Sequence, residues 1–299
     1  RISYEKRKAL YGYGFISIWL VGTLCFFFIP LLKSFIWSFC DVTIDTGDTN
    51  LKWIGLKNFE DALTVDPKYT DCLKTALLET LWKTPLIVIF SLFIAVILNQ
   101  NFKGRAVARA IFFLPVIIAT GPVYAIISGD INSTGNTGAA QFSTMFSTNM
   151  VGELLQFLGI YGLSDNMEAV ISAVSDNIFS IVWASGIQIL LFLAALQTIP
   201  TSAREAAQLE GATAWEYFWK ITFPMISPII LVNSIYTIID LFTNETNEMM
   251  QDIKTAIFTD IKYGYGSAMA WIYFIVVLLI VGLIAAICSS FVFYQRKSE

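Results

Sequence analysis

The chain contains 299 residues, of which 56% are hydrophobic and only 14% charged, and its mean hydropathy is +0.65. This balance excludes an ordinary soluble domain and is typical of a protein that lies in a membrane. The chain has no histidine, and its four cysteines lack metal-ligand spacing, which excludes a zinc site and histidine-dependent catalysis. There is also no Arg-rich stripe, so nucleic acid is excluded as a partner.

Six apolar runs that are long enough to cross a bilayer follow one another along the chain. The first run is too long for a cleavable signal peptide, so we expect it to remain as a helix. We therefore predict an all-α integral membrane protein with six transmembrane helices. The predicted spans are Tyr11 to Leu32, Leu81 to Leu98, Ala106 to Ser128, Ile178 to Ile199, Met225 to Phe242, and Ala268 to Phe293.

The Lys and Arg residues of the connecting segments predict the orientation, because cytoplasmic loops carry an excess of them. With the N-terminus inside, acids dominate the outer segments, and residues 129–177 contain no Lys or Arg. Both termini are therefore predicted to face the cytoplasm. The basic residues of the inner segments are Arg1, Lys6, Arg7, Lys8, Lys103, Arg105, Arg109, Arg204, Lys220, Arg296 and Lys297.

Two long outer segments, 34–80 and 129–177, alternate apolar and polar stretches, for which we expect short helices on the outer membrane surface. Cys40 and Cys72 share the first of these segments and leave a disulfide open, although we expect free thiols. We see no internal repeat or flexible linker, so residues 1–299 are predicted to form one transmembrane domain. Its core covers 73–293, and a cytoplasmic loop covers 200–224.

That cytoplasmic loop is predicted to begin with a short helix. Pro200 ends the preceding membrane helix, and Thr201 or Ser202 can cap the next one. Glu205 is expected in the first turn, where the helix dipole favours a negative charge. The helix is predicted to run to residue 210, because Gly211 can adopt the left-handed conformation that ends a helix.

A second short helix is predicted after this glycine, with Trp215, Phe218 and Trp219 on an apolar face. The small Ala206 and Ala207 of the first helix permit close approach of another protein, as when a rigid helix lies in a groove. The loop is therefore predicted to be a docking element. The alternative is an Ala-rich amphipathic helix that simply lies on the inner membrane surface.

The loop resembles the EAA loop of ABC importer permeases. The resemblance is carried by Glu205-Ala-Ala, Gly211, and Ile221-x-Phe223-Pro224 at the family spacing; the departures are Phe223 for the usual Leu and Glu210 for the usual Asp. It implies the type I importer fold and a coupling helix that sits in a cleft of a separate ATPase subunit. The coupling residues implied are Glu205, Ala206, Ala207, Gly211, Ala212 and Pro224.

Other stretches are similar to the MalF-like permeases that accept carbohydrates. They are Trp53 to Phe59, Phe28 to Phe39, and Leu196 to Pro200. The family element after the fifth helix does not match at Asn244 to Met250. The resemblance implies a sugar or oligosaccharide as the substrate.

One face of the fifth predicted helix carries polar residues at spacings of four, three and four: Asn233, Thr237, Asp240 and Asn244. Tyr236 lies beside this stripe. Carboxylates, amides and aromatic rings suit sugar recognition, so this face is a candidate substrate path. The alternative is hydrogen bonding between helices. Trp183 and Gln188 of the fourth helix are further candidates for the path.

The chain has no GxxxxGK[ST] motif and no paired nucleophile and base, so we expect neither an enzyme nor a bound cofactor. By resemblance, ATP and Mg belong to a partner ATPase. The implied partners are a second permease, two ATPase subunits, an external solute-binding protein, a sugar and the lipid of a bacterial cell membrane. Alternatives are a polyol or glycerol phosphate importer, an ion-coupled secondary transporter and a membrane scaffold.

Overall fold

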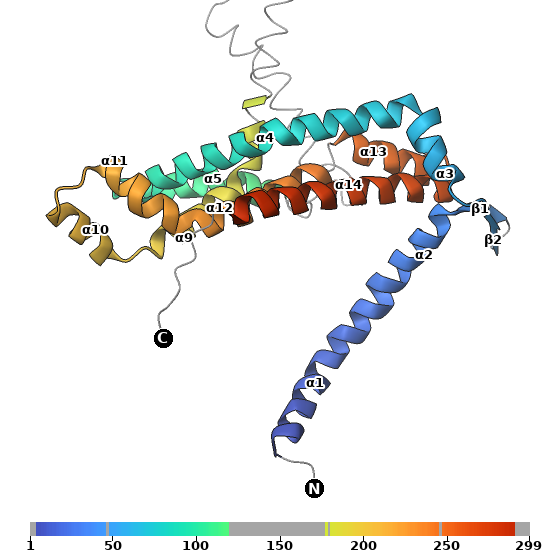
Figure 1. Ribbon diagram of the computed structural model, residues 1–299, viewed down its shortest axis with the longest axis horizontal. Helices are drawn as coiled ribbons and strands as arrows, with labels where there is room; N and C mark the ends of the chain where they lie inside the picture. Colours follow the sequence, from blue (N-terminus) through green and yellow to red (C-terminus); the bar gives the residue numbers. More distant parts are fainter. Residues whose placement is uncertain (1–3, 46–47, 120–176, 179, 245–246, 291–299) are drawn as a thin grey trace, which may run out of the picture. The chain divides into compact units, whose positions relative to one another are not determined.

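The computed structural model describes residues 4–45, 48–119, 177–178, 180–244 and 247–290. The chain divides into two compact units: unit 1 comprises Arg1–Lys74 and Glu248–Val276, and unit 2 comprises Thr75–Asn247 and Val277–Glu299. The chain passes between the units within α4 (Pro67–Asn99), between Asn247 and Glu248, and within α14 (Tyr263–Ser289). Figure 1 labels the helices and strands of both units.

Unit 1 begins with an uninterrupted N-terminal helix and continues into a small β-hairpin. The antiparallel hairpin pairs Cys40 with Trp53 and Val42 with Leu51. The elements of this unit, besides the parts of α4 and α14, are α1 (Tyr4–Thr23), η1 (Leu24–Phe28), α2 (Ile29–Ser38), β1 (Cys40–Asp45), β2 (Asp48–Trp53), α3 (Lys57–Glu60), η2 (Asp61–Val65), α13 (Glu248–Lys254) and η4 (Thr255–Thr259), where η denotes a π-helical stretch.

The hairpin corrects the prediction that the chain is all-α and that segment 34–80 holds only short surface helices. The ring of Phe39 stacks on Trp53, with centroids 5.5 Å apart, and packs against Phe59 at 5.2 Å. The Asn58 side chain donates hydrogen bonds to the carbonyls of Ser38 and Cys40, both at 3.0 Å. The stretch from Trp53 to Phe59 therefore has a structural role in closing this corner of unit 1.

The beginning of α14 packs tightly within unit 1. The hydroxyl of Tyr69 donates to the carbonyl of Met269 at 2.8 Å, and that of Tyr265 donates to Asp66 at 2.8 Å. Gly264 lies so close to the backbone of β1 that a Cβ there would overlap the carbonyl oxygen of Cys40. All four cysteines of the chain are free, as expected.

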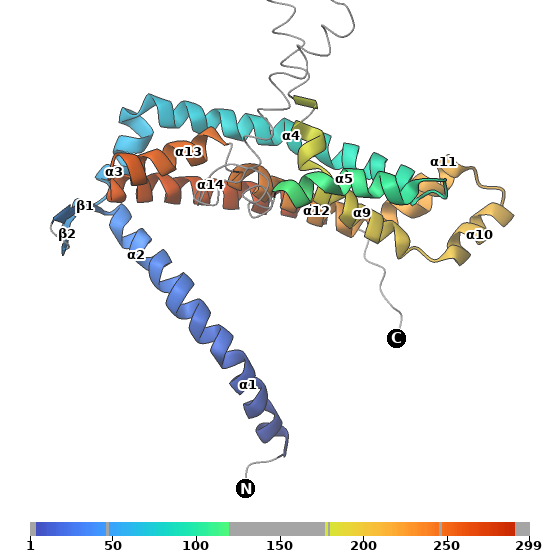
Figure 2. The ribbon, with the colours of Figure 1, turned by 180° about the vertical axis from the view of Figure 1, so that it is seen from behind.

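Unit 2 holds the helices that surround the predicted coupling loop. Helices α9 and α12 pack against each other, and α5 packs against α9, as Figure 2 shows from behind. The elements are the rest of α4 and α14 with α5 (Arg105–Ala119), α9 (Gly186–Gln197), α10 (Thr201–Leu209), α11 (Ala214–Tyr217), η3 (Phe218–Thr222) and α12 (Phe223–Thr243).

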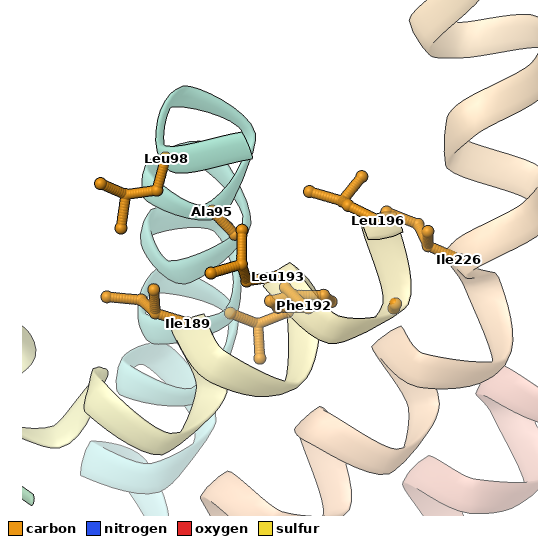
Figure 3. Packing of buried hydrophobic residues seen from close by; sticks show 9 residues of the cluster. Ala95, Leu98, Ile189, Phe192, Leu193, Leu196 and Ile226 are labelled. Atoms are coloured by element: carbon orange, nitrogen blue, oxygen red, sulfur yellow. The ribbon is translucent and has the colours of Figure 1, made fainter. Parts of the chain in front are cut away.

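The core of unit 2 is apolar and draws on three helices. Phe192 of α9 is fully buried, and Ala95 of α4 and Ile226 of α12 lie on either side of α9 in Figure 3. In a bilayer such side chains stabilise the unit by close packing, because the lipid that they exclude is as apolar as they are. The nine core residues are Val88, Ala95, Leu98, Ile189, Phe192, Leu193, Ala195, Leu196 and Ile226.

Four helical stretches among the described residues are long and apolar enough to cross a membrane, which supports part of the predicted topology. They are Ile16–Ser38, Pro67–Asn99, Ala214–Thr243 and Tyr263–Ser289. A fifth candidate joins α9 and α10 across a bend of 66°. The helix that contains the second predicted span begins earlier, at Pro67, because its polar first turns belong to unit 1. The third ends outside the described residues, and segment 129–177 lies almost wholly outside them.

Candidate coupling loop and transport path

Helix α10 begins at Thr201, as expected, but its start is capped differently. Pro200 occupies the N-cap position with extended backbone, and no side chain caps the helix. The prediction of a Thr201 or Ser202 cap was therefore wrong, because the extended conformation falls on the proline and both hydroxyl residues are already helical. Glu205 lies in the second turn, so its predicted place in the first turn was also wrong.

The end of α10 confirms the left-handed conformation predicted for Gly211. Its φ is +78°, a left-handed conformation that glycine adopts at no steric cost. The amide of Gly211 donates to the carbonyl of Gln208 at 3.1 Å, and the amide of Ala212 donates to Ala207 at 2.9 Å. These two bonds form a Schellman motif, which ends the helix and fixes the direction in which the chain leaves it.

The second helix starts with a capping box that the sequence analysis missed, although Thr-x-x-Glu is its usual signature. The amide of Glu216 donates to Oγ1 of Thr213 at 3.3 Å, and the amide of Thr213 donates to Oε2 of Glu216 at 3.0 Å. This cap begins an uninterrupted helical stretch, Ala214–Thr243. The helix that contains the predicted fifth span therefore begins at Ala214, ahead of Met225.

Together α10, the Gly211 turn and α11 form a helical hairpin at one end of unit 2 (Figure 1). Glu205 and Ala206 are exposed on it, whereas Ala207 is buried. An open hollow of ≈ 260 Å³ lies on the buried side of the hairpin. Its lining includes Asn99 and Gln100 at the end of α4, together with Ala207, Ala212 and Tyr217.

Pro224 is the second residue of α12, which directly follows the π-helical stretch η3. Farther along α12, Pro228 lacks the amide that would bond to the carbonyl of Pro224. The hydroxyl of Ser227 donates to that carbonyl at 2.7 Å instead. The Ser227 hydroxyl therefore gives the Pro224 carbonyl a partner where the loop joins α12 and Pro228 interrupts the regular hydrogen bonding of the helix.

Three of the proposed path residues are buried and bonded to one another between α9 and α12. Nε2 of Gln188 donates to Oγ1 of Thr237 at 3.1 Å, and Nδ2 of Asn233 donates to the carbonyl of Gln188 at 3.2 Å. Thr237 also donates to the carbonyl of Asn233 at 2.8 Å. This geometry favours helix–helix hydrogen bonding for these three residues.

The other four path residues are placed differently. Tyr236 and Asp240 are half-buried on α12, and Asp240 is the only charged residue of that helix. Asn244 is exposed just beyond the end of α12, and Trp183 lies just before a turn at Ser185 that precedes α9. The predicted polar face is therefore split into a buried helix contact and a more accessible part.

We compared the chain with known proteins. No family model matches it. A probable ABC transporter permease protein of Bacillus subtilis, YesP, is 35% identical over 98% of this chain and 95% of its own length. The chain belongs to the ABC transporter permeases. The multiple sugar-binding transport system permease protein MsmF of Streptococcus mutans is 28% identical to this permease and covers 91% of it, with 93% of MsmF covered.

Solved structures show that the permease shares the fold of an ABC importer. A crystal structure of a bacterial ABC transporter that imports the acidic polysaccharide alginate has a chain with a TM-score of 0.66, 21% identity, and coverage of 95% and 96%. A second, in complex with a periplasmic protein that binds alginate pentasaccharide, gives 0.64, 18% identity and the same coverage. The permease is thus a membrane protein of a transport family whose relatives include sugar permeases.

Proposed function

We propose that this permease forms half of the translocation path of an ATP-driven, binding-protein-dependent importer for a sugar or oligosaccharide. It would have six transmembrane helices in one domain, with both termini in the cytoplasm. Its partners would be a second permease, two ATPase subunits and an external solute-binding protein. The observation that carries the proposal is the glycine-ended hairpin of residues 201–222, at the EAA spacing, in a chain of this family.

The helical hairpin of residues 201–222 can transmit a movement of α10 to the membrane helices. Helix α10 offers Glu205 and Ala206 on its exposed side, where small side chains allow a groove of the ATPase to approach closely. The Schellman bonds at Gly211 hold α10 at a set angle to the next helix, and that helix continues into α12. A movement of α10 driven by ATP and Mg in the partner would therefore reach the membrane helices without being absorbed by a flexible loop.

A sugar is the substrate that the relatives favour, because MsmF is named for sugar transport. Polyols and glycerol phosphate remain alternatives within the same machine. A phosphate group on the solute would favour basic side chains along the path. Among the described residues, helices α9 and α12 contain no Lys or Arg, which favours an uncharged solute. Membership in the family favours the importer over an ion-coupled secondary transporter or a scaffold.

The importer proposal is tested by purifying the permease from its native membrane in mild detergent and identifying every protein that accompanies it. We expect an ATPase and a second permease, and an ATPase activity that rises when the solute-binding protein and its sugar are added. If the permease is recovered alone, and its proteoliposomes accumulate solute from an ion gradient without ATP, the importer proposal fails.

We further propose that Asp240 and Tyr236 line the solute path, whereas Gln188, Asn233 and Thr237 join two helices. Replacing Asp240 with Asn should then raise the solute concentration for half-maximal transport by about tenfold, the cost of one or two lost hydrogen bonds, with little change in Tm. Replacing Thr237 with Val is the matched control. Loss of its bond to Gln188 should lower stability by about 0.6–2 kcal/mol and leave that solute concentration nearly unchanged. The opposite pattern would assign the path to the buried residues.

A further inference from the structure

The helical stretch that follows the Gly211 turn presents an aromatic surface that the coupling role does not explain. The side chains of Trp215 and Trp219 are 71% and 45% exposed. Their rings lie 5.5 Å apart, and the ring of Trp219 lies 5.1 Å from that of Phe223. We define Trp215, Trp219 and Phe223 as the aromatic strip.

The aromatic strip points away from the interior of unit 2. The other side of the same stretch lines the hollow behind α10, through Ala214, Tyr217, Phe218 and Thr222. Positions 215 and 219 are four residues apart and therefore share a face, and they do not line the hollow. The two tryptophans therefore share a face of the helix that nothing in the described part of unit 2 covers.

The length of the helix places this strip at a membrane surface. The stretch Ala214–Thr243 has 30 residues, which span about 45 Å at 1.5 Å per residue. The hydrocarbon core of a bilayer is only about 30 Å thick, so several residues at each end lie at the level of the headgroups. Trp215 and Trp219 fall within the first six residues. Tryptophan is enriched at this level because its ring is apolar while its N–H can bond to water or headgroups.

Charge at this end of unit 2 suits anionic headgroups. Lys220 lies next to Trp219, and its ammonium is 3.3 Å from Glu216 on the same helix. Other basic residues at this end are Lys103 in the turn after α4, Arg105 at the start of α5 and Arg204 on α10, and they lie beside the acids Glu205 and Glu210. Basic residues beside interfacial aromatics are attracted to the negative surface of a cytoplasmic leaflet.

We propose that the aromatic strip anchors the start of the fifth span in the headgroup region of the bilayer, with lipid as its occupant, while α10 stays in water. Such an anchor would act as a fulcrum. It would hold Trp215 and Trp219 at a fixed depth in the bilayer. A displacement of α10 would then tilt α12 and would not shift it along the membrane normal. The inference depends on the membrane location of the chain and does not require the ATPase.

The anchor is tested by fluorescence in nanodiscs of phosphatidylethanolamine and phosphatidylglycerol, some of them carrying acyl chains brominated near the carboxyl end. The chain has 8 tryptophans, so the signal of interest is the difference between the full chain and its Trp215→Phe, Trp219→Phe double variant. Phenylalanine keeps the apolar packing, and circular dichroism checks the fold. We expect brominated lipid to quench this difference signal roughly twofold more than aqueous acrylamide does.

The matched control places a tryptophan on α10, by adding Leu209→Trp to the double variant, because Leu209 is 90% exposed. Its fluorescence should respond to acrylamide and not to brominated lipid. If the strip instead responds only to acrylamide, or becomes protected only when the ATPase is added, the lipid anchor is wrong. If position 209 is also quenched by lipid, α10 lies on the membrane and its docking to an ATPase fails separately.

Discussion

Replacing Gly211 with Val should reduce transport and solute-stimulated ATPase activity by about 5- to 30-fold, the effect of one or two kcal/mol on an equilibrium. The reason is conformational, because a Cβ at this position would meet nothing within 4 Å. The cost comes from the φ of +78°, because the left-handed conformation costs an L-residue with a side chain about 1–2 kcal/mol. A valine would favour either continuation of α10 past residue 211 or unfolding of its last turn. In both cases the angle between α10 and the next helix would no longer be fixed.

The measurement is sugar uptake by proteoliposomes that contain the complete importer, with ATP inside and the binding protein outside. Gly211→Asn should retain more activity than Gly211→Ala, because asparagine tolerates the left-handed conformation better. Gly282→Ala is the matched control, since Gly282 also has open space but lies within α14 without a positive φ. Equal activity of the Val variant and the original chain would show that the turn does not set the coupling.

Replacing Gly264 with Ala should destabilise unit 1 severely, although it adds only one methyl group. That group would overlap the carbonyl oxygen of Cys40 and would lie 3.2 Å from the carbonyl oxygen of Trp37 and 3.3 Å from Nδ2 of Asn58. Backbone atoms cannot rotate away as a flexible side chain can. Overpacking of this kind costs about 1–3 kcal/mol or more, and here it would also displace Asn58 from the carbonyls that it joins.

We expect a lower Tm in detergent, measured by intrinsic fluorescence during heating. We also expect a lower yield of the assembled complex. Gly282→Ala serves again as the control, because it adds the same atom to the same helix in open space. It should leave the Tm unchanged or raise it slightly, since alanine stabilises a helix interior by up to about 1 kcal/mol relative to glycine. Equal Tm values for the two variants would mean that α14 does not approach β1 closely.

The sequence by itself determined the membrane class of the protein and the glycine turn of the candidate coupling loop. Apolar runs predict spanning helices because the requirement acts on each segment separately, and four of the described helices are long enough. The turn at Gly211 was also predictable, since a left-handed helix end depends on one residue and its nearest neighbours. The same local chemistry would have revealed the capping box at Thr213.

Only the tertiary structure decided which polar residues face one another. The stripe on α12 keeps a helical spacing of four and three residues, but Asn233 and Thr237 contact Gln188 of α9, whereas Asp240 does not share those bonds. The β-hairpin of unit 1 is closed by Asn58, which bonds to a carbonyl far back in the chain. The close approach of Gly264 to Cys40 likewise joins residues that are distant in the sequence. Periodicity tells which residues share a face, but the neighbour that covers the face depends on how the helices pack, which no local pattern encodes.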